Sequence, residues 1–73
     1  ISKQRLMRII QSCDQVAHLN LSYMNECVDQ EVLFLIGEKF QKTLISLELR
    51  ACNGVDDLGI IGMCERLSSF YDN

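Results

Sequence analysis

One stretch of this chain decides its fold: Leu44-Ile45-Ser46-Leu47-Glu48-Leu49-Arg50-Ala51-Cys52-Asn53-Gly54-Val55. Leucine recurs three and then five residues after Leu44, and a polar turn and a second apolar stretch follow. The same spacing begins 28 residues earlier at Val16, with Leu19 and Leu21 in the corresponding places. An apolar pattern that recurs with a period of 20 to 50 residues is typical of proteins that stack one structural unit on the next. The sequence therefore predicts a surface for recognition and not a catalytic pocket.

Within each copy the apolar spacing changes from a strand period to a helix period. Leu19 and Leu21, like Leu47 and Leu49, alternate with polar residues, which predicts two short strands with one buried face each. Between the two predicted strands, apolar residues three and four apart predict one face of a helix. These helix-spaced residues are Val32, Leu35, Ile36 and Phe40.

Turn and cap residues are expected between each strand and the following helix. Asp29 and Asp57 lie at equivalent places in the two copies, where a carboxylate would accept the free amide hydrogens of a first helical turn. Gly54 lies in the turn after the second strand, where glycine would accommodate a positive φ. Strand, turn, helix and turn in succession predict an α/β fold that coils in a right-handed sense.

The chain divides into two copies of this unit and a partial copy at each end. The first repeat covers residues 16–43 and the second 44–69, and both lengths suit a stacked repeat. Residues 1–15 look like the end of a preceding repeat, and residues 70–73 would start the next. Neither end is expected to carry a polar cap, so we expect further repeats or neighbouring subunits to cover both ends.

The cysteines and the residues around them resemble the cysteine-containing subclass of leucine-rich repeats. The resemblance covers nearly the whole chain and is best in the second repeat, although Met24 replaces the cysteine of the first repeat. It implies a right-handed leucine-rich-repeat solenoid fragment, with parallel strands on one face and helices on the other. The matching residues are Cys13, Leu19-x-Leu21, Cys52, Val55-Asp56-Asp57 and Ile60-x-x-Met63-Cys64.

The resemblance also implies a function. Members of this subclass are typically F-box proteins, the substrate-recognition subunits of cullin-type ubiquitin ligases. Other members lack the F-box and belong to large assemblies, such as an axonemal dynein regulatory complex subunit and subunit s of mitochondrial ATP synthase. The stretches 42–49 and 52–55 look somewhat like subunit s. We therefore expect ligase substrate-recognition repeats or, alternatively, a structural subunit. In both cases no catalytic residue and no cofactor are expected.

The outward residues of the two predicted strands form the candidate binding surface. In a parallel coil these residues line the concave face, and the register pairs residues 28 positions apart. Tyrosine and arginine are enriched at binding hot spots, so a protein partner is expected here, although solvated strand residues would give the same pattern. The predicted rows pair His18 with Ser46, Asn20 with Glu48 and Ser22 with Arg50, and Tyr23 and Ala51 extend them.

Composition limits the other classes of function. The 73 residues hold 7 basic and 10 acidic side chains, and this net charge of −3 argues against a nucleic-acid partner. The longest apolar run, Val32–Ile36, is far shorter than a membrane span. Membrane insertion is therefore not expected.

The four cysteines are expected to be buried free thiols. Cys13, Cys27, Cys52 and Cys64 form no C-x-x-C pair, and the chain has one histidine, so no zinc site is expected. Free buried thiols imply a reducing intracellular compartment, the cytoplasm or nucleus, with the mitochondrion as an alternative. Since His18 should point outward, away from these thiols, a Cys–His enzyme is not expected.

Overall fold

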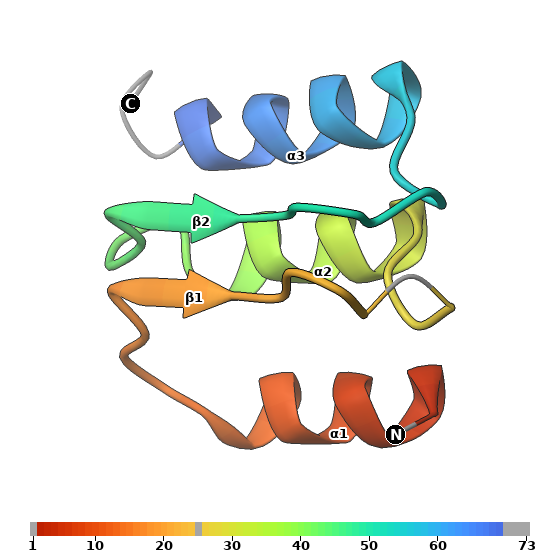
Figure 1. Ribbon diagram of the computed structural model, residues 1–73. Coiled ribbons are helices and arrows are strands. Elements are labelled where there is room, and N and C mark those ends of the chain that lie inside the picture. Colours follow the sequence, from red (N-terminus) through yellow and green to blue (C-terminus); the bar gives the residue numbers. More distant parts are fainter. Residues whose placement is uncertain (1, 25, 70–73) are drawn as a thin grey trace.

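Helices and strands alternate along the chain in the computed structural model, which describes residues 2–24 and 26–69 (Figure 1). The expected alternation of strand and helix is confirmed. The predicted start of a further repeat, residues 70–73, lies outside the described residues. The elements are α1 (Lys3–Ser12), β1 (His18–Asn20), α2 (Gln30–Lys39), β2 (Ser46–Glu48) and α3 (Asp57–Ser69).

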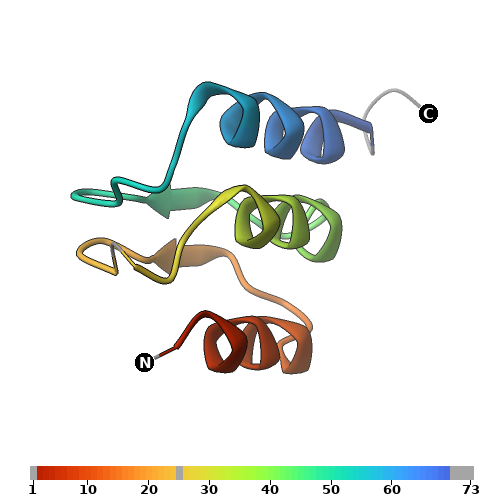
Figure 2. The same ribbon diagram turned by 90° about the vertical axis from the view of Figure 1, so that its right-hand side faces the viewer.

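The strands form one layer and the helices form the other. β1 and β2 pair in parallel, with Leu19 opposite Leu47. Figure 2 shows the strands on one side and the helices side by side on the other, with α2 between α1 and α3. Figure 1 shows that α1, α2 and α3 run in the same direction, opposite to β1 and β2. Each strand–helix unit therefore lies beside the one that precedes it in the sequence.

Backbone pairing continues beyond the two short strands. The Ser46 amide donates to the Ala17 carbonyl oxygen at 3.0 Å, and at the other end the Tyr23 amide donates to the Arg50 carbonyl oxygen at 2.7 Å. The two segments therefore stay in register from residue 17 to residue 23. This length fixes the positions of the side chains that project from them.

The sharp turn after each strand has an unusual backbone. Tyr23 and Ala51 adopt positive φ angles of 69° and 56°, a conformation that side chains with a Cβ atom disfavour. The expectation that Gly54 would supply a positive φ is wrong, because no described glycine has one. The chain turns immediately after each strand, three residues before Gly54 in the second copy.

The helices α1, α2 and α3 begin with the same kind of cap. Ser2, Asp29 and Asp56 follow one another at intervals of 27 residues, and each side chain accepts the backbone N–H three residues later, at 3.2, 3.3 and 2.9 Å. The cap expected at Asp29 is confirmed. The cap expected at Asp57 is wrong, because Asp57 is the first residue of α3. The strands are 28 residues apart and the caps 27, so the connection into α3 is one residue shorter.

The hydrophobic core is centred on α2. Val32, Leu33 and Ile36 are completely buried, and Phe40 follows at the end of the helix with 1% of its surface exposed. Burial of one such side chain contributes roughly 1.5–3 kcal/mol relative to full exposure. α2 reaches this burial because α1, the sheet and α3 each cover part of its surface.

The cysteines are free thiols in different surroundings. Cys27 and Cys52 are buried, but Cys13 is half-buried and Cys64 is exposed, so the expectation that all four are buried is wrong. Cys64 occupies on α3 the position that Gly37 occupies on α2, counted from the helix cap. α3 covers Gly37, whereas no described helix lies on the corresponding side of α3.

Glycine allows α2 and α3 to approach closely. A Cβ atom on Gly37 would lie 2.9 Å from the Met63 carbonyl oxygen and 3.0 Å from the Cβ atom of Arg66. On α3, a Cβ atom on Gly62 would collide with the Phe34 ring. The two helices therefore pack at a distance that larger residues would not permit.

We expect Gly37→Ala to destabilise the protein by about 1–3 kcal/mol, because the added methyl group meets backbone atoms of α3. This loss is expected although alanine favours a helix over glycine by about 1 kcal/mol. Urea unfolding measures the difference, and Gln4→Ala on an exposed part of α1 serves as the control, with a change within about 0.5 kcal/mol. A Gly37→Ala variant as stable as this control would contradict the close packing.

An ion-pair cluster links the start of α1 to the start of α2. The Lys3 ammonium lies 2.7 Å from the Asp29 carboxylate and 3.2 Å from that of Glu31. The hydrogen bond to Asp29 is the main reason that the pKa of Lys3 is raised above 10.5. Burial raises the pKa of Asp29, but the bonds from Lys3 and from the Val32 amide outweigh it, and the net pKa lies below 3.8.

The lowered pKa of Asp29 makes the stability depend on pH in a defined direction. The Lys3–Asp29 pair stabilises the protein fully above the ordinary pKa of 3.8, and this contribution is lost as pH falls through the lower folded value. Lys3→Gln should therefore be less stable than the parent at pH 7, with a smaller difference at pH 2, measured by urea unfolding. Lys39→Gln removes a 3.9 Å pair with the exposed Asp14 and should change stability little at either pH.

Candidate functional site

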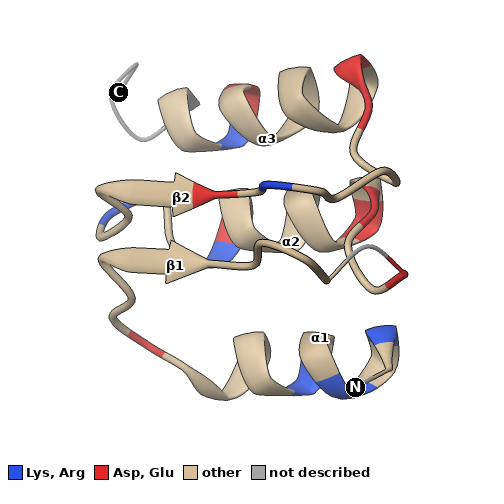
Figure 3. Ribbon diagram, in the orientation of Figure 1, with Lys and Arg blue, Asp and Glu red and all other residues tan. Residues whose placement is uncertain are grey.

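The exposed side chains of the paired strands form one surface, which we call the strand face. The predicted register is confirmed for its first two rows, because His18 lies opposite Ser46 and Asn20 opposite Glu48. Figure 3 shows an acidic segment at the end of β2 and a basic segment just after it. Glu48 is the last residue of β2, and Arg50 follows two positions later. All members are exposed except the half-buried Ser22. They are His18, Asn20, Ser22, Tyr23, Ser46, Glu48 and Arg50.

Hydrogen bonds order several of these side chains across and along the strands. Nδ1 of His18 lies 2.8 Å from Oγ of Ser46, so the first row is joined side chain to side chain. The Ser22 hydroxyl accepts the Arg50 backbone N–H at 3.0 Å, which confirms the third predicted row. The Asn20 side-chain oxygen in turn accepts the Ser22 backbone N–H at 3.0 Å. A partner that binds here therefore meets groups that are already ordered, which lowers the entropic cost of binding.

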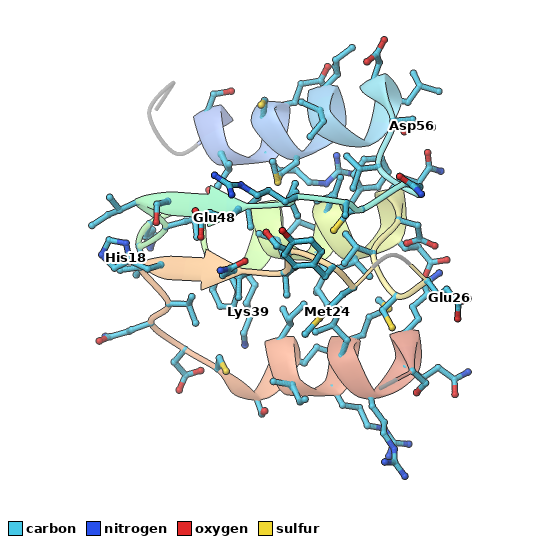
Figure 4. The ribbon with its side chains drawn as sticks, viewed as in Figure 1. His18, Met24, Glu26, Lys39, Glu48 and Asp56 are labelled. Carbon is cyan, nitrogen blue, oxygen red and sulfur yellow. The ribbon has the colours of Figure 1, made fainter. Side chains whose placement is uncertain are left out.

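Three side chains of the strand face point their functional groups to solvent. Among the described residues, no hydrogen bond or ion pair joins the Glu48 carboxylate, the Arg50 guanidinium or the Tyr23 hydroxyl to another group, and all three side chains are exposed. Tyr23 is 75% exposed and sits in the turn with positive φ. Figure 4 labels His18 and Glu48 on neighbouring strands, with Glu48 farther along the strand direction. A carboxylate, a guanidinium and an aromatic ring are thus offered within one small area.

The sequence alone did not indicate Ile45, which is 76% exposed directly before β2. Its amide donates to the Ala17 carbonyl oxygen, so it lies level with the start of β1, whereas Tyr23 lies level with Arg50 at the other end. At about 3.3 Å per residue, these two apolar side chains are about 20 Å apart along the strands. The adjacent apolar residues Leu44 and Ile45 carried a signal for this. Side chains alternate between the two faces of a strand, so only one of two adjacent residues faces the core.

The His18–Ser46 pair has the distance expected of a base and a nucleophile, but not the surroundings. Catalysis by such a pair needs a third group that orients the base and a site from which water is excluded. Both residues are exposed on an open strand surface. Within the described ranges, no three His, Cys, Asp or Glu side chains lie close enough together to hold a metal ion. The two side chains are therefore joined to each other on an open, hydrated surface.

Comparisons with family models, curated proteins and solved structures gave no match to this chain. The family resemblance consequently stays a prediction that rests on the residues quoted above. Among the helices of residues 2–24 and 26–69, none has the length and apolar character that crossing a membrane requires.

We expect Ser22→Ala to lower the free energy of unfolding by about 0.5–1.5 kcal/mol, because its hydroxyl accepts the Arg50 amide and joins the two segments. Ser46→Ala removes a bond between two exposed side chains and should cost less than about 0.5 kcal/mol. Urea unfolding of both variants measures the contrast. Equal losses would show that the Ser22 bond does not hold the segments together.

Proposed function

We propose that the strand face binds another protein and that the chain is part of the substrate-recognition repeats of an F-box-type ubiquitin ligase adaptor. The observation that most supports this proposal is the parallel register, which arranges exposed polar side chains in rows across the two strands. The exposed Tyr23 and Arg50 belong to the residue types most common at binding hot spots. Ile45 adds an apolar contact at the opposite end.

The proposal includes a right-handed leucine-rich-repeat solenoid, of which residues 16–43 and 44–69 would be two repeats. Two regularities support it. The paired strand residues are 28 positions apart, and three equivalent helix caps follow at intervals of 27. A unit of this kind buries its apolar face by stacking on its neighbour. In such a solenoid the strand face is the concave surface.

The proposal also includes two further points: the protein binds its partner without catalysing a reaction, and it resides in a reducing compartment. The polar groups of the strand face are open to water, where charge stabilisation is too weak to drive a reaction. The buried Cys52 thiol donates to the Leu21 carbonyl oxygen at 3.1 Å, a bond that oxidation would remove. We place the protein in the cytoplasm or nucleus on this basis. No cofactor is part of the proposal.

The alternative function is a structural subunit of a large assembly, similar to subunit s of mitochondrial ATP synthase or to an axonemal subunit. It is favoured by the resemblance of the stretches 42–49 and 52–55 to subunit s. In this alternative the same strand face would contact a permanent neighbour. The compartment would then be the mitochondrion or the axoneme.

A photo-reactive amino acid in place of Tyr23, the most exposed aromatic side chain described, would identify the partner. The intact protein is expressed in its native cells, cross-linked and analysed by mass spectrometry. Cross-links to a ligase substrate, with cullin and an F-box adaptor recovered alongside, would support the first function. Cross-links to ATP synthase or axonemal subunits would replace it with the alternative. The same group placed at Gln11, an exposed position on α1, is the control.

Arg50→Ala should weaken binding of the identified partner at least fivefold, which corresponds to about 1 kcal/mol, while leaving the free energy of unfolding nearly unchanged. The reason is that the exposed guanidinium has no bond to a described group that the substitution would break. Arg5→Ala removes an exposed arginine from α1 and is the matched control, because it changes the net charge equally. Similar losses from both variants, read out by isothermal titration calorimetry, would indicate a general charge effect and not a site.

A further inference from the structure

The outer side of α3, the side that faces away from α2, is unusually apolar for an exposed helix surface. Ile60 and Ile61 are 36% and 53% exposed, and Cys64 is exposed beside them. Glu65 continues the same stripe toward the end of the helix. We call these four residues the α3 outer face. It belongs to the helix layer, so it is separate from the strand face on the other layer (Figure 2).

α2, one repeat earlier in the sequence, has an equivalent face, and that face is covered by another helix. Counted from the helix caps, the α3 outer face corresponds to Leu33, Phe34, Gly37 and Glu38. These α2 residues are the ones that receive α3. Their side chains and backbone make close contacts with glycines and backbone atoms of α3.

The contacts on α2 define what the face accepts. Leu33 packs against Gly59 and Phe34 against Gly62, so the incoming helix presents two glycines three residues apart. Arg66, four residues after the second glycine, lies 3.2 Å from Glu38. The Arg66 guanidinium also lies 4.2 Å from the centre of the Phe34 ring. Apolar side chains with a carboxylate at the edge therefore bind a helix with small residues and one basic residue.

We propose that the α3 outer face binds a helix of another protein that carries two small residues three positions apart and a basic residue four positions after the second. Ile60 and Ile61 receive the small residues, as Leu33 and Phe34 receive the two glycines of α3. Glu65 pairs with the basic residue, as Glu38 pairs with Arg66. This inference concerns a different surface from the strand face, so its test is separate from that of the proposed function; a further repeat of the same chain stacked on α3 would exclude it.

A second copy of this chain fits the face less well. The outer side of α1 carries Arg5 and Arg8 where α3 carries Gly59 and Gly62, counted from the caps, so long side chains would hold the two helices apart. Two α3 helices packed against each other in opposite directions would bring Asp57 of each copy near Glu65 of the other. Like charges at that distance repel.

The test uses a labelled peptide with the sequence of residues 56–69, since α3 itself is the helix that fills the equivalent face of α2. Binding to the 73-residue protein is measured by fluorescence anisotropy. Ile61→Asp in the protein should weaken binding at least tenfold, because a carboxylate then replaces the apolar contact. Ile9→Asp is the matched control on the outer side of α1, where Ile9 is 51% exposed, and should change affinity less than twofold.

A charge exchange keeps the test informative if Ile61→Asp disturbs folding. Glu65→Lys in the protein should weaken binding of the parent peptide at least threefold, and an Arg66→Glu peptide should recover it. Circular dichroism of each variant checks that the fold is kept. Recovery of affinity by the exchanged pair would require direct contact between these two positions.

Five outcomes would overturn the proposal. They are absence of peptide binding, equal losses from Ile61→Asp and Ile9→Asp, and binding that survives Ile61→Asp because the peptide displaces α3 from α2. The fourth is sedimentation that shows self-association sensitive to Ile61→Asp, which would assign the face to a second copy. Binding that disappears when residues 1–73 carry their native flanking sequence would also reject a separate partner, because the chain would then cover the face itself.

Discussion

The burial of α2 between two parallel helices and a sheet is the constraint on which the rest of this structure depends. Val32, Leu33 and Ile36 lose all contact with water, and this happens because glycine on α2 and α3 lets the helices approach until backbone and side chain touch. The close approach sets the distance between neighbouring units. The strands that precede α2 and α3 are then carried to the hydrogen-bonding distance at which parallel strands pair.

The strand face and the α3 outer face follow from this packing in different ways. Parallel pairing places equivalent residues of the two strands side by side, so polar residues 28 positions apart become neighbours. Helix stacking has a different consequence. The side of α2 that corresponds to the α3 outer face is covered by α3, whereas the α3 outer face itself is exposed. The polar strand face suits selective recognition. The apolar residues of the α3 outer face favour aggregation in water unless another surface covers them.

Particular residues show how far sequence patterns carried the prediction. Alternating leucines located both strands and their register, and the cap at Asp29 followed from residue type. The cap of α3 was misplaced by one residue, at Asp57 and not Asp56, because a period read from strands does not report the length of the following connection. The positive φ expected at Gly54 belongs to Ala51 and Tyr23, since backbone pairing and not residue preference imposes the turn.

The amino-acid pattern by itself determined the order of elements, the parallel register and the polar rows of the strand face, because a two-residue strand period and a 28-residue repeat leave little freedom. The tertiary structure decided which helix positions are covered. Gly37 and Cys64 occupy equivalent positions counted from the helix caps, yet Gly37 is buried and Cys64 is exposed. Burial of a helix face depends on whether another helix lies against it, and that neighbour is set by packing and not by local sequence.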